Sequence, residues 1–252
     1  MEIGSGALTA LMLGFLLGLK HATDADHVVA VSTIVSEYRN PWRGLWVGVS
    51  WGLGHTTPLL ILGTIILLFK DPVAERYEAV APFLEFGVGI MLVFLGLQVF
   101  WNFRRRRVHA HVHGHEEYAH GHVEDIHRDP RTHELSPPPK SHHGFFQPGK
   151  PLFRLKSYVV GVVHGLAGSA AVMLLVLTTD VVSSFQVGLL YILLFGLGTV
   201  LSMGVITLLM GIPFSISGRF ERVNRVIAGV AGTSSIAFGL LLIYELAIVQ
   251  GL

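Results

Sequence analysis

The chain has 252 residues and a formal net charge of +1, with 51% hydrophobic residues, 14% charged residues and a mean hydropathy of +0.58. About a quarter of the residues in an ordinary soluble domain are charged, so this composition predicts an integral membrane protein. The near-neutral charge gives no reason to expect nucleic acid as a partner, and the absence of cysteine excludes disulfides, thiolate metal sites and cysteine nucleophiles.

Long apolar stretches predict an all-α, polytopic fold with six transmembrane helices, since crossing a bilayer takes about 20 apolar residues. The predicted helices cover residues 6–36, 44–69, 80–103, 154–179, 184–211 and 226–249. The first is longer than a hydrocarbon layer of about 30 Å requires, so we expect it to be tilted, bent or partly unwound around its polar middle. Pro41, Pro72, Pro82 and Pro213 fall near predicted helix ends, whereas Pro58 should kink the second helix.

Basic residues are distributed unevenly between the two sides of the predicted membrane domain. The loops after the first, third and fifth helices, with their flanks, carry fifteen Lys and Arg residues, whereas the opposite side carries only Lys70 and Arg76. The positive-inside rule therefore predicts a multi-pass protein of the cell (inner) membrane, with the basic loops in the cytoplasm and both termini outside.

One long connection, residues 104–151, contains ten of the fourteen histidines. They are His109, His111, His113, His115, His120, His122, His127, His133, His142 and His143. We expect a partly disordered cytoplasmic loop that binds metal loosely; the alternative is a solvated linker whose histidines are incidental. The loop separates a first transmembrane unit, residues 1–103, from a second unit, residues 152–252.

Glycine spacing in the first three predicted helices is repeated in the last three. Gly14 and Gly18 correspond to Gly161 and Gly165, Gly52 and Gly54 to Gly196 and Gly198, and Gly89 and Gly96 to Gly232 and Gly239. Because each unit has three helices, a duplication would give a 3+3 inverted repeat with a pseudo-two-fold axis in the membrane plane. The alternative is ordinary packing of helices through small residues.

The stretch from Lys20 to His27 places two imidazoles and two carboxylates inside an apolar segment. Ionisable side chains at membrane depth are costly unless they are paired, hydrated or bound to a cation, so they indicate a functional site. Imidazole with carboxylate is a ligand set for a borderline divalent metal. The sequence therefore predicts a protein that moves such an ion through the lipid bilayer.

Depth in the membrane follows from counting about 1.5 Å per helical residue. His27 and His55 each lie twelve residues from a basic residue of the same predicted loop, so their rings can meet at one level about 18 Å from the cytoplasmic side. His21 is expected about 9 Å further out, and His164 about 12 Å from the cytoplasmic side. For His164 alone, an interhelical hydrogen bond is the alternative to metal binding.

The two carboxylates have different expected positions. On an unbroken helix His21, Asp24 and His27 span an arc of about 120°, whereas Asp26 points almost opposite Asp24. One carboxylate is then a metal ligand, and the other accepts an interhelical hydrogen bond, pairs with Lys20 or orients an imidazole. Local unwinding would let both face the metal. The candidate metal site comprises His21, Asp24, Asp26, His27, His55 and His164.

Two of these segments resemble the signatures of a known family. His21-x4-Asp26-His27 is similar to the HX4DH motif of the nickel/cobalt transporter (NiCoT) superfamily, and the LGHTT stretch around His55 is similar to its LGH(S/T)T motif. The resemblance implies that His21, Asp26, His27 and His55 recognise Ni²⁺ or Co²⁺. The second half lacks the further motifs of the eight-helix members. It is closer to the shorter urease-accessory type nickel permeases and the histidine-loop nickel/cobalt exporters.

The expected function is transport of Ni²⁺ or Co²⁺ by alternating access, in which one repeat rocks against the other, with uptake favoured over efflux. The ion is the substrate, and neither a prosthetic group nor an enzymatic activity is expected. Because neutral imidazole is the ligand, uptake should fall as pH drops from about 6 to about 5. A cytoplasmic nickel chaperone is a possible partner. The alternatives are an intramembrane zinc-dependent hydrolase, although no HExxH motif is present, and a membrane-anchored metal sensor.

Overall fold

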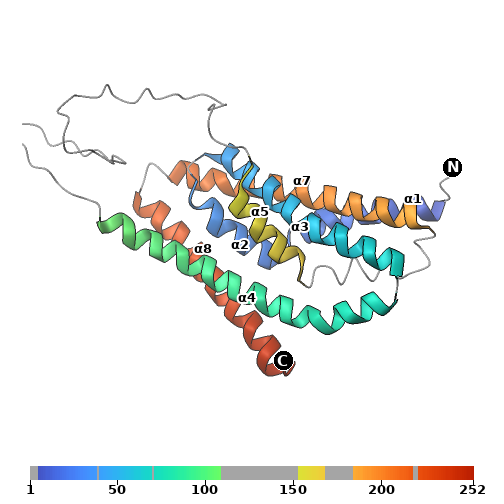
Figure 1. Cartoon of the computed structure of the whole chain (residues 1–252). Coiled ribbons are helices and arrows are strands. Elements are labelled where there is room, and N and C mark those ends of the chain that lie inside the picture. Colours follow the sequence, from blue (N-terminus) through green and yellow to red (C-terminus); the bar gives the residue numbers. More distant parts are fainter. Residues whose placement is uncertain (1–4, 39, 70, 109–152, 168–183, 218–220) are drawn as a thin grey trace, which may run out of the picture.

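The computed structural model describes residues 5–38, 40–69, 71–108, 153–167, 184–217 and 221–252, and most of these residues are helical (Figure 1). The helices are α1 (Ser5–His21), α2 (Ala25–Val35), α3 (Pro41–Phe69), α4 (Asp71–Val108), α5 (Leu155–Gly165), α7 (Phe185–Ser217) and α8 (Glu221–Tyr244). A π-helical segment, η1 (Glu245–Val249), follows α8 directly. The prediction of an all-α fold is confirmed for the described residues.

Four of the described helices, α3, α4, α7 and α8, are long and apolar enough to cross a membrane. The pair α1 and α2 makes a fifth candidate span if it is taken together, because the two helices meet at a bend of 53°. The predicted helix over residues 154–179 is described only as α5: it ends at Gly165, Leu166 and Ala167 form a turn and a bend rather than helix, and residues 168–179 lie outside the described residues.

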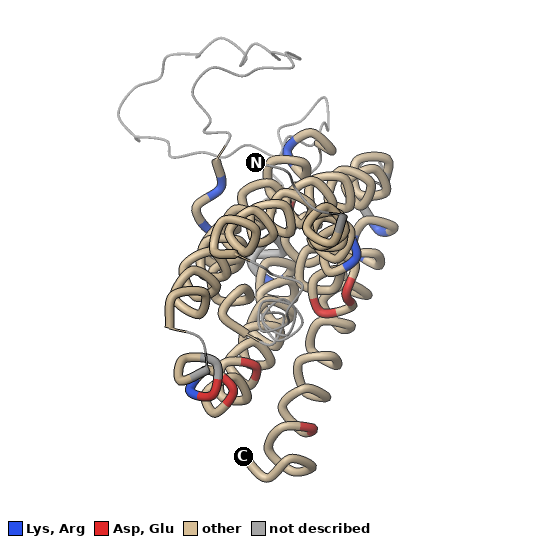
Figure 2. The backbone as a smooth tube through the Cα atoms, turned by 90° about the vertical axis from the view of Figure 1, so that its right-hand side faces the viewer, with Lys and Arg blue, Asp and Glu red and all other residues tan. Residues whose placement is uncertain are grey.

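Large apolar side chains cover the outer surface of the helices. Met12, Leu16, Ile61, Leu68 and Phe94 are each more than half exposed. Soluble proteins rarely expose apolar surface on this scale, so these side chains face lipid. Figure 2 shows the charged residues of the described helices confined to short patches. Together with the candidate spans, this surface identifies a multi-pass membrane protein.

The ends of two helices differ from the prediction. Helix α4 begins at Asp71 rather than near residue 80, so Pro82, expected near a helix end, lies inside it, as Pro213 lies inside α7. The additional turns of α4 are polar, so the apolar pattern of the sequence does not extend over them. At its other end α4 continues to Val108, so the first residues of the predicted loop are helical. The remainder of that loop lies outside the described residues.

Helices from the two halves of the chain pack against each other rather than separately. Helix α3 lies against α7 and α5, α1 against α7, and α4 against α8, while α2 contacts α8, α4 and α7 (Figure 1). Glycines allow these backbones to touch. A Cβ added at Gly18 would overlap the carbonyl oxygen of Phe195, one at Gly54 that of Tyr158, and one at Gly96 that of Gly232.

We expect Gly54→Ala to destabilise the protein, because the added methyl group would push α3 away from the α5 backbone at Tyr158. Overpacking of this kind costs about 1–3 kcal/mol. Gly229→Ala in α8 is the matched control, since nothing lies within 4 Å of a Cβ placed there. The midpoint of thermal unfolding in detergent should fall for Gly54→Ala only. Equal midpoints for the two variants would contradict the close approach of α3 and α5.

Helix ends with basic residues gather at one end of the molecule, where the C-terminal end of α4 lies near the start of α8 (Figure 1). Glu37, just after α2, accepts hydrogen bonds from Asn102 of α4 (3.2 Å) and Lys156 of α5 (3.4 Å). The guanidinium carbon of Arg154 lies 5.4 Å from the ring centre of Tyr38. Segments far apart in the sequence are thus joined at this end by polar contacts.

Candidate metal centre

The chain leaves the helical path between α1 and α2, as the length of the first predicted helix suggested. Thr23 donates a hydrogen bond from Oγ1 to the carbonyl of Lys20 (2.6 Å), and Asp24 has the extended dihedral angles φ −62° and ψ 146°. Serine, threonine and aspartate compete with the helix for backbone groups in this way. The break makes His21 the last residue of α1 and places His27 in the first turn of α2.

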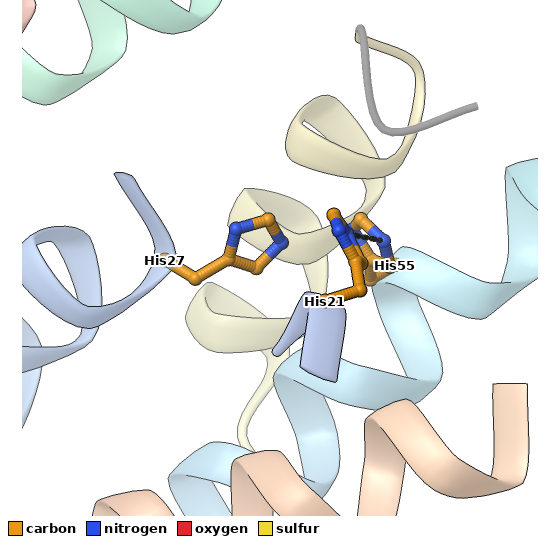
Figure 3. Close-up of side chains that lie close together, drawn as sticks. All are labelled: His21, His27 and His55. Carbon is orange, nitrogen blue, oxygen red and sulfur yellow. Dashed lines mark hydrogen bonds between the residues drawn. The ribbon is translucent and has the colours of Figure 1, made fainter. Parts of the chain in front are cut away.

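Three imidazoles from α1, α2 and α3 converge at this break (Figure 3). The ring centres of His21 and His27 are 4.5 Å apart, and each lies 5.1 Å from the ring centre of His55. His27 and His55 therefore meet, as predicted. The expectation that His21 lies about 9 Å further out is wrong. It assumed a continuous helix, whereas the bend folds His21 back onto His27.

Asp24 holds the ring of His21 in one orientation. Its carboxylate accepts hydrogen bonds from Lys20 Nζ and from His21 Nδ1, both at 2.9 Å. An ionised carboxylate only accepts hydrogen bonds, so the proton of a neutral His21 ring is on Nδ1. The lone pair is then on Nε2, which accepts a hydrogen bond from Nε2 of His55 (3.1 Å). Asp24 thus combines two of the roles considered from the sequence, namely a partner for Lys20 and a group that orients an imidazole.

Asp26 holds the ring of His27 in one orientation and also forms a hydrogen bond with a residue of α5. One carboxylate oxygen accepts hydrogen bonds from the backbone N–H and from Nδ1 of His27, both at 2.9 Å, and the other accepts one from His164 Nε2 at 2.8 Å. The lone pair of His27 is therefore on Nε2. That nitrogen is buried without a hydrogen-bond partner and points toward His21 and His55 (Figure 3).

The three histidines have the spacing of a metal site. His21, His27 and His55 each offer a ligand atom, and these atoms lie within 4.8 Å of one another. Two imidazole nitrogens of a tetrahedral site, each about 2.0–2.1 Å from the metal, are about 3.4 Å apart. The 3.1 Å between His21 and His55 is close to that value. Carboxylates behind two of the imidazoles are the usual support of histidine ligands, because they set the tautomer and raise ligand basicity.

His164 lies beside this group rather than alone. Its ring centre is 4.3 Å from that of His27, and Asp26, His27 and His164 form a second set of potential ligand atoms within 4.8 Å of one another. Close packing of α5 on α3 places it there, since Gly161 and Gly165 lie directly against the backbone of Trp51 and His55. The structure thus brings together all six residues predicted for the site.

Two aromatic residues beside the site, Trp51 and Phe195, were not predicted. Phe195 of α7 stacks on His21 with ring centres 5.6 Å apart, and Trp51 of α3 lies 5.6 Å from His164 and 6.5 Å from His27. The signal was present in the repeat, because Trp51 and Phe195 occupy equivalent positions before the paired glycines of WGLGH and FGLGT. These two rings lie against His21, His27 and His164 and make part of the surroundings of the site apolar.

Comparison with known proteins identifies relatives over almost the entire chain. Residues 7–214 match the model of a family described as high-affinity nickel-transport protein. The chain is 40% identical over 245 residues to the urease accessory protein UreH of Bacillus sp. (strain TB-90), covering 97% of this chain and 95% of that protein.

More distant relatives share less of their length. Chloroplast protein FOR GROWTH AND FERTILITY 1 of Arabidopsis thaliana is 27% identical, over 94% of this chain and 59% of its own. The high-affinity nickel-transport protein NixA of Helicobacter pylori (strain ATCC 700392 / 26695) is 26% identical, over 72% of this chain and 56% of its own. The chain thus spans little more than half the length of these two proteins. No solved structure matches it.

Proposed function

We propose, from the premise that this chain belongs to the family of high-affinity nickel-transport proteins, that it carries Ni²⁺, or Co²⁺ in its place, across the cell membrane. The observation that carries this proposal is the convergence of three buried imidazoles, from three different helices, on one position. A lipid bilayer excludes a doubly charged ion, so a transporter must replace part of its hydration shell. Neutral imidazoles are suitable ligands for Ni²⁺ and Co²⁺.

In this proposal His21, His27 and His55 bind the ion through Nε2, and the proton that His55 carries on Nε2 in the structure is on Nδ1, which has no hydrogen-bond partner, when the ion is bound. Asp24 and Asp26 act behind them, because each holds a ligand ring by hydrogen bonds of 2.9 Å. With Lys20 paired to Asp24, the two carboxylates and the ammonium group leave one negative charge beside the ion. That charge offsets part of the cost of bringing a divalent cation into the membrane. The protein needs no prosthetic group, because the metal is its substrate.

We also propose that the membrane domain is a 3+3 inverted repeat, with units at residues 1–103 and 152–252 separated by the loop 104–151. The packing supports this arrangement. In the repeat, α1 corresponds to α5, α3 to α7 and α4 to α8. The contact of α1 with α7 therefore has its equivalent in the contact of α5 with α3, and the α3–α7 and α4–α8 contacts join equivalent helices. Such a pattern is expected of a pseudo-two-fold axis that passes between the repeats.

Alternating access then requires two bodies that move relative to each other. Rocking of one repeat against the other would break the backbone contacts of Gly18 with Phe195 and of Gly54 with Tyr158. A division between α2, α4 and α8 on one side and α1, α3, α5 and α7 on the other preserves these contacts. It places His27 on one body and His21 and His55 on the other, so the movement itself would open or close the metal site.

The proposed direction is uptake, with both termini outside and the basic helix ends in the cytoplasm. The clustering of Glu37, Asn102, Lys156 and Arg154 at one end of the molecule supports this orientation. The histidine-rich loop would then lie on the cytoplasmic side, where it could receive the arriving ion before a nickel chaperone takes it.

Flux measurements test the proposal. We expect protein reconstituted in vesicles containing a metal-sensitive dye to transport Ni²⁺ and Co²⁺ with saturable kinetics, and Zn²⁺ more slowly. Vesicles without protein are the control for leakage, and vesicles of both protein orientations, separated by their accessibility to a protease, report the direction. A flux of all three ions that equals the leakage would overturn the proposal.

A further inference from the structure

A second group of potential ligand atoms, from Asp26, His27 and His164, lies beside the three-histidine centre, on the Nδ1 side of the His27 ring. We propose that Asp26, His27 and His164 form a second coordination position, to which the ion passes from the centre made by His21, His27 and His55. This inference rests on the proposed function, because it adds a second position to the same transport route. It assigns His164 as a ligand rather than only a hydrogen-bond donor.

The ligand atoms of the second position are already assembled. Asp26 Oδ1 lies 2.9 Å from His27 Nδ1, and Asp26 Oδ2 lies 2.8 Å from His164 Nε2. Both rings are buried, and their centres are 4.3 Å apart. A carboxylate with two imidazoles is a common divalent-metal ligand set. Nδ1 of His164 is buried without a partner, so that ring is not held by a hydrogen bond on its other edge.

Sharing His27 makes the two positions mutually exclusive. A neutral imidazole has one lone pair, which is on Nε2 when the ion is in the first position and must be on Nδ1 when it is in the second. The proton of His27 is therefore on Nδ1 when the ion is in the first position and on Nε2 when it is in the second, and that of His164 is on Nε2 and on Nδ1, respectively. The number of protons at the site is unchanged. The ion therefore occupies one position at a time, which allows it to advance without being trapped.

The two positions also differ in charge. The first presents three neutral rings, whereas the second adds a carboxylate in direct contact with the ion. His164 lies nine residues after the start of α5, whose first residues are at the basic end of the molecule. The second position is thus on the side of the centre from which α5 enters. In the proposed orientation this is the step toward the cytoplasm.

A spectroscopic test uses the absence of cysteine from this chain. His164→Cys introduces one thiol at the second position, and a Co²⁺–thiolate charge-transfer band can then arise only if the metal reaches residue 164. We expect this band in the full-length variant and not in wild-type protein, whose loop histidines give no thiolate band. Val163→Cys, the preceding residue on the lipid side of α5, is the matched control and should give none. A folded His164→Cys protein without the band overturns the proposal.

Transport kinetics separate a ligand from a merely structural residue. His164→Gln preserves a hydrogen-bond donor toward Asp26 but not the imidazole ligand. We expect the maximal Ni²⁺ flux to fall by more than about tenfold, because a ligand is lost although the hydrogen bond to Asp26 is kept, while half-saturation changes little. A wild-type flux in His164→Gln would reduce His164 to a hydrogen-bond donor. If that result occurred while His55→Ala abolished flux, the second position would be wrong and the proposed function would remain.

Discussion

Replacing His55 by alanine is expected to reduce Ni²⁺ transport by more than about 100-fold. His55 is fully buried, and its Nε2 lies 3.1 Å from that of His21, so the substitution removes one of three ligands at the centre. Loss of a group that only supports a metal ligand costs about 10–100-fold in affinity or activity, and loss of the ligand itself should cost more. The initial rate of Ni²⁺ entry into vesicles, over a range of concentrations, measures the effect.

The control for His55→Ala is a substitution of a histidine in the histidine-rich loop 104–151. His120→Ala removes one of the ten loop histidines and should leave the rate close to that of wild type. The amount of monodisperse protein and its thermal midpoint show whether His55→Ala is folded. A folded variant that transports Ni²⁺ at the wild-type rate would mean that the imidazoles of α1, α2 and α3 do not form the transport site.

Replacing Asp26 by asparagine is expected to lower transport by about 10–100-fold, although the side chain keeps its size. The carboxylate accepts hydrogen bonds from both His27 and His164. An amide can accept one and must donate in place of the other, so one of these rings is forced into the opposite tautomer. If that ring is His27, its proton then points into the metal centre. In either case one negative charge is lost beside the ion.

Glu37→Gln is the matched control for Asp26→Asn, because it makes the same change near the other end of α2. Glu37 bonds to Asn102 and Lys156 and not to any histidine of the centre. The two variants should therefore differ in Ni²⁺ affinity, measured by the concentration dependence of transport. Equal, wild-type behaviour of both would show that the tautomers of His27 and His164 do not depend on Asp26.

The class of protein and the chemistry of its site could be predicted from the sequence, because both depend on which residues are near one another along the chain. Long apolar runs require a membrane, whatever the order of the helices. Four ionisable side chains within the seven residues from His21 to His27 require a partner at that depth. Equal distances of His27 and His55 from the basic loop between their helices predicted that the two rings meet, as their 5.1 Å separation shows.

The details of helix ends could not be predicted in this way. The polar first turns of α4 carry no apolar signal, and they form a helix because they continue a long, well-formed one. Pro82 therefore falls inside α4 rather than at its start. The position of His21 also depends on the break between α1 and α2, which a depth calculated at about 1.5 Å per helical residue does not include. Hydrogen bonds from Thr23 to Lys20 and an extended Asp24 bend the chain by 53° and return His21 to His27.

By itself, the sequence determined that this is a helical membrane protein with imidazoles and carboxylates grouped inside an apolar segment, since residue types and their spacing are sufficient for that conclusion, and it predicted a divalent-metal site there. Only the tertiary structure decided which nitrogen each ring presents and which carboxylate supports which histidine. The hydrogen bond between Asp26 and His164 joins residues 138 positions apart. Such a contact depends on the close packing of α5 against α3, and it is this packing that brings the two ligand sets together around His27.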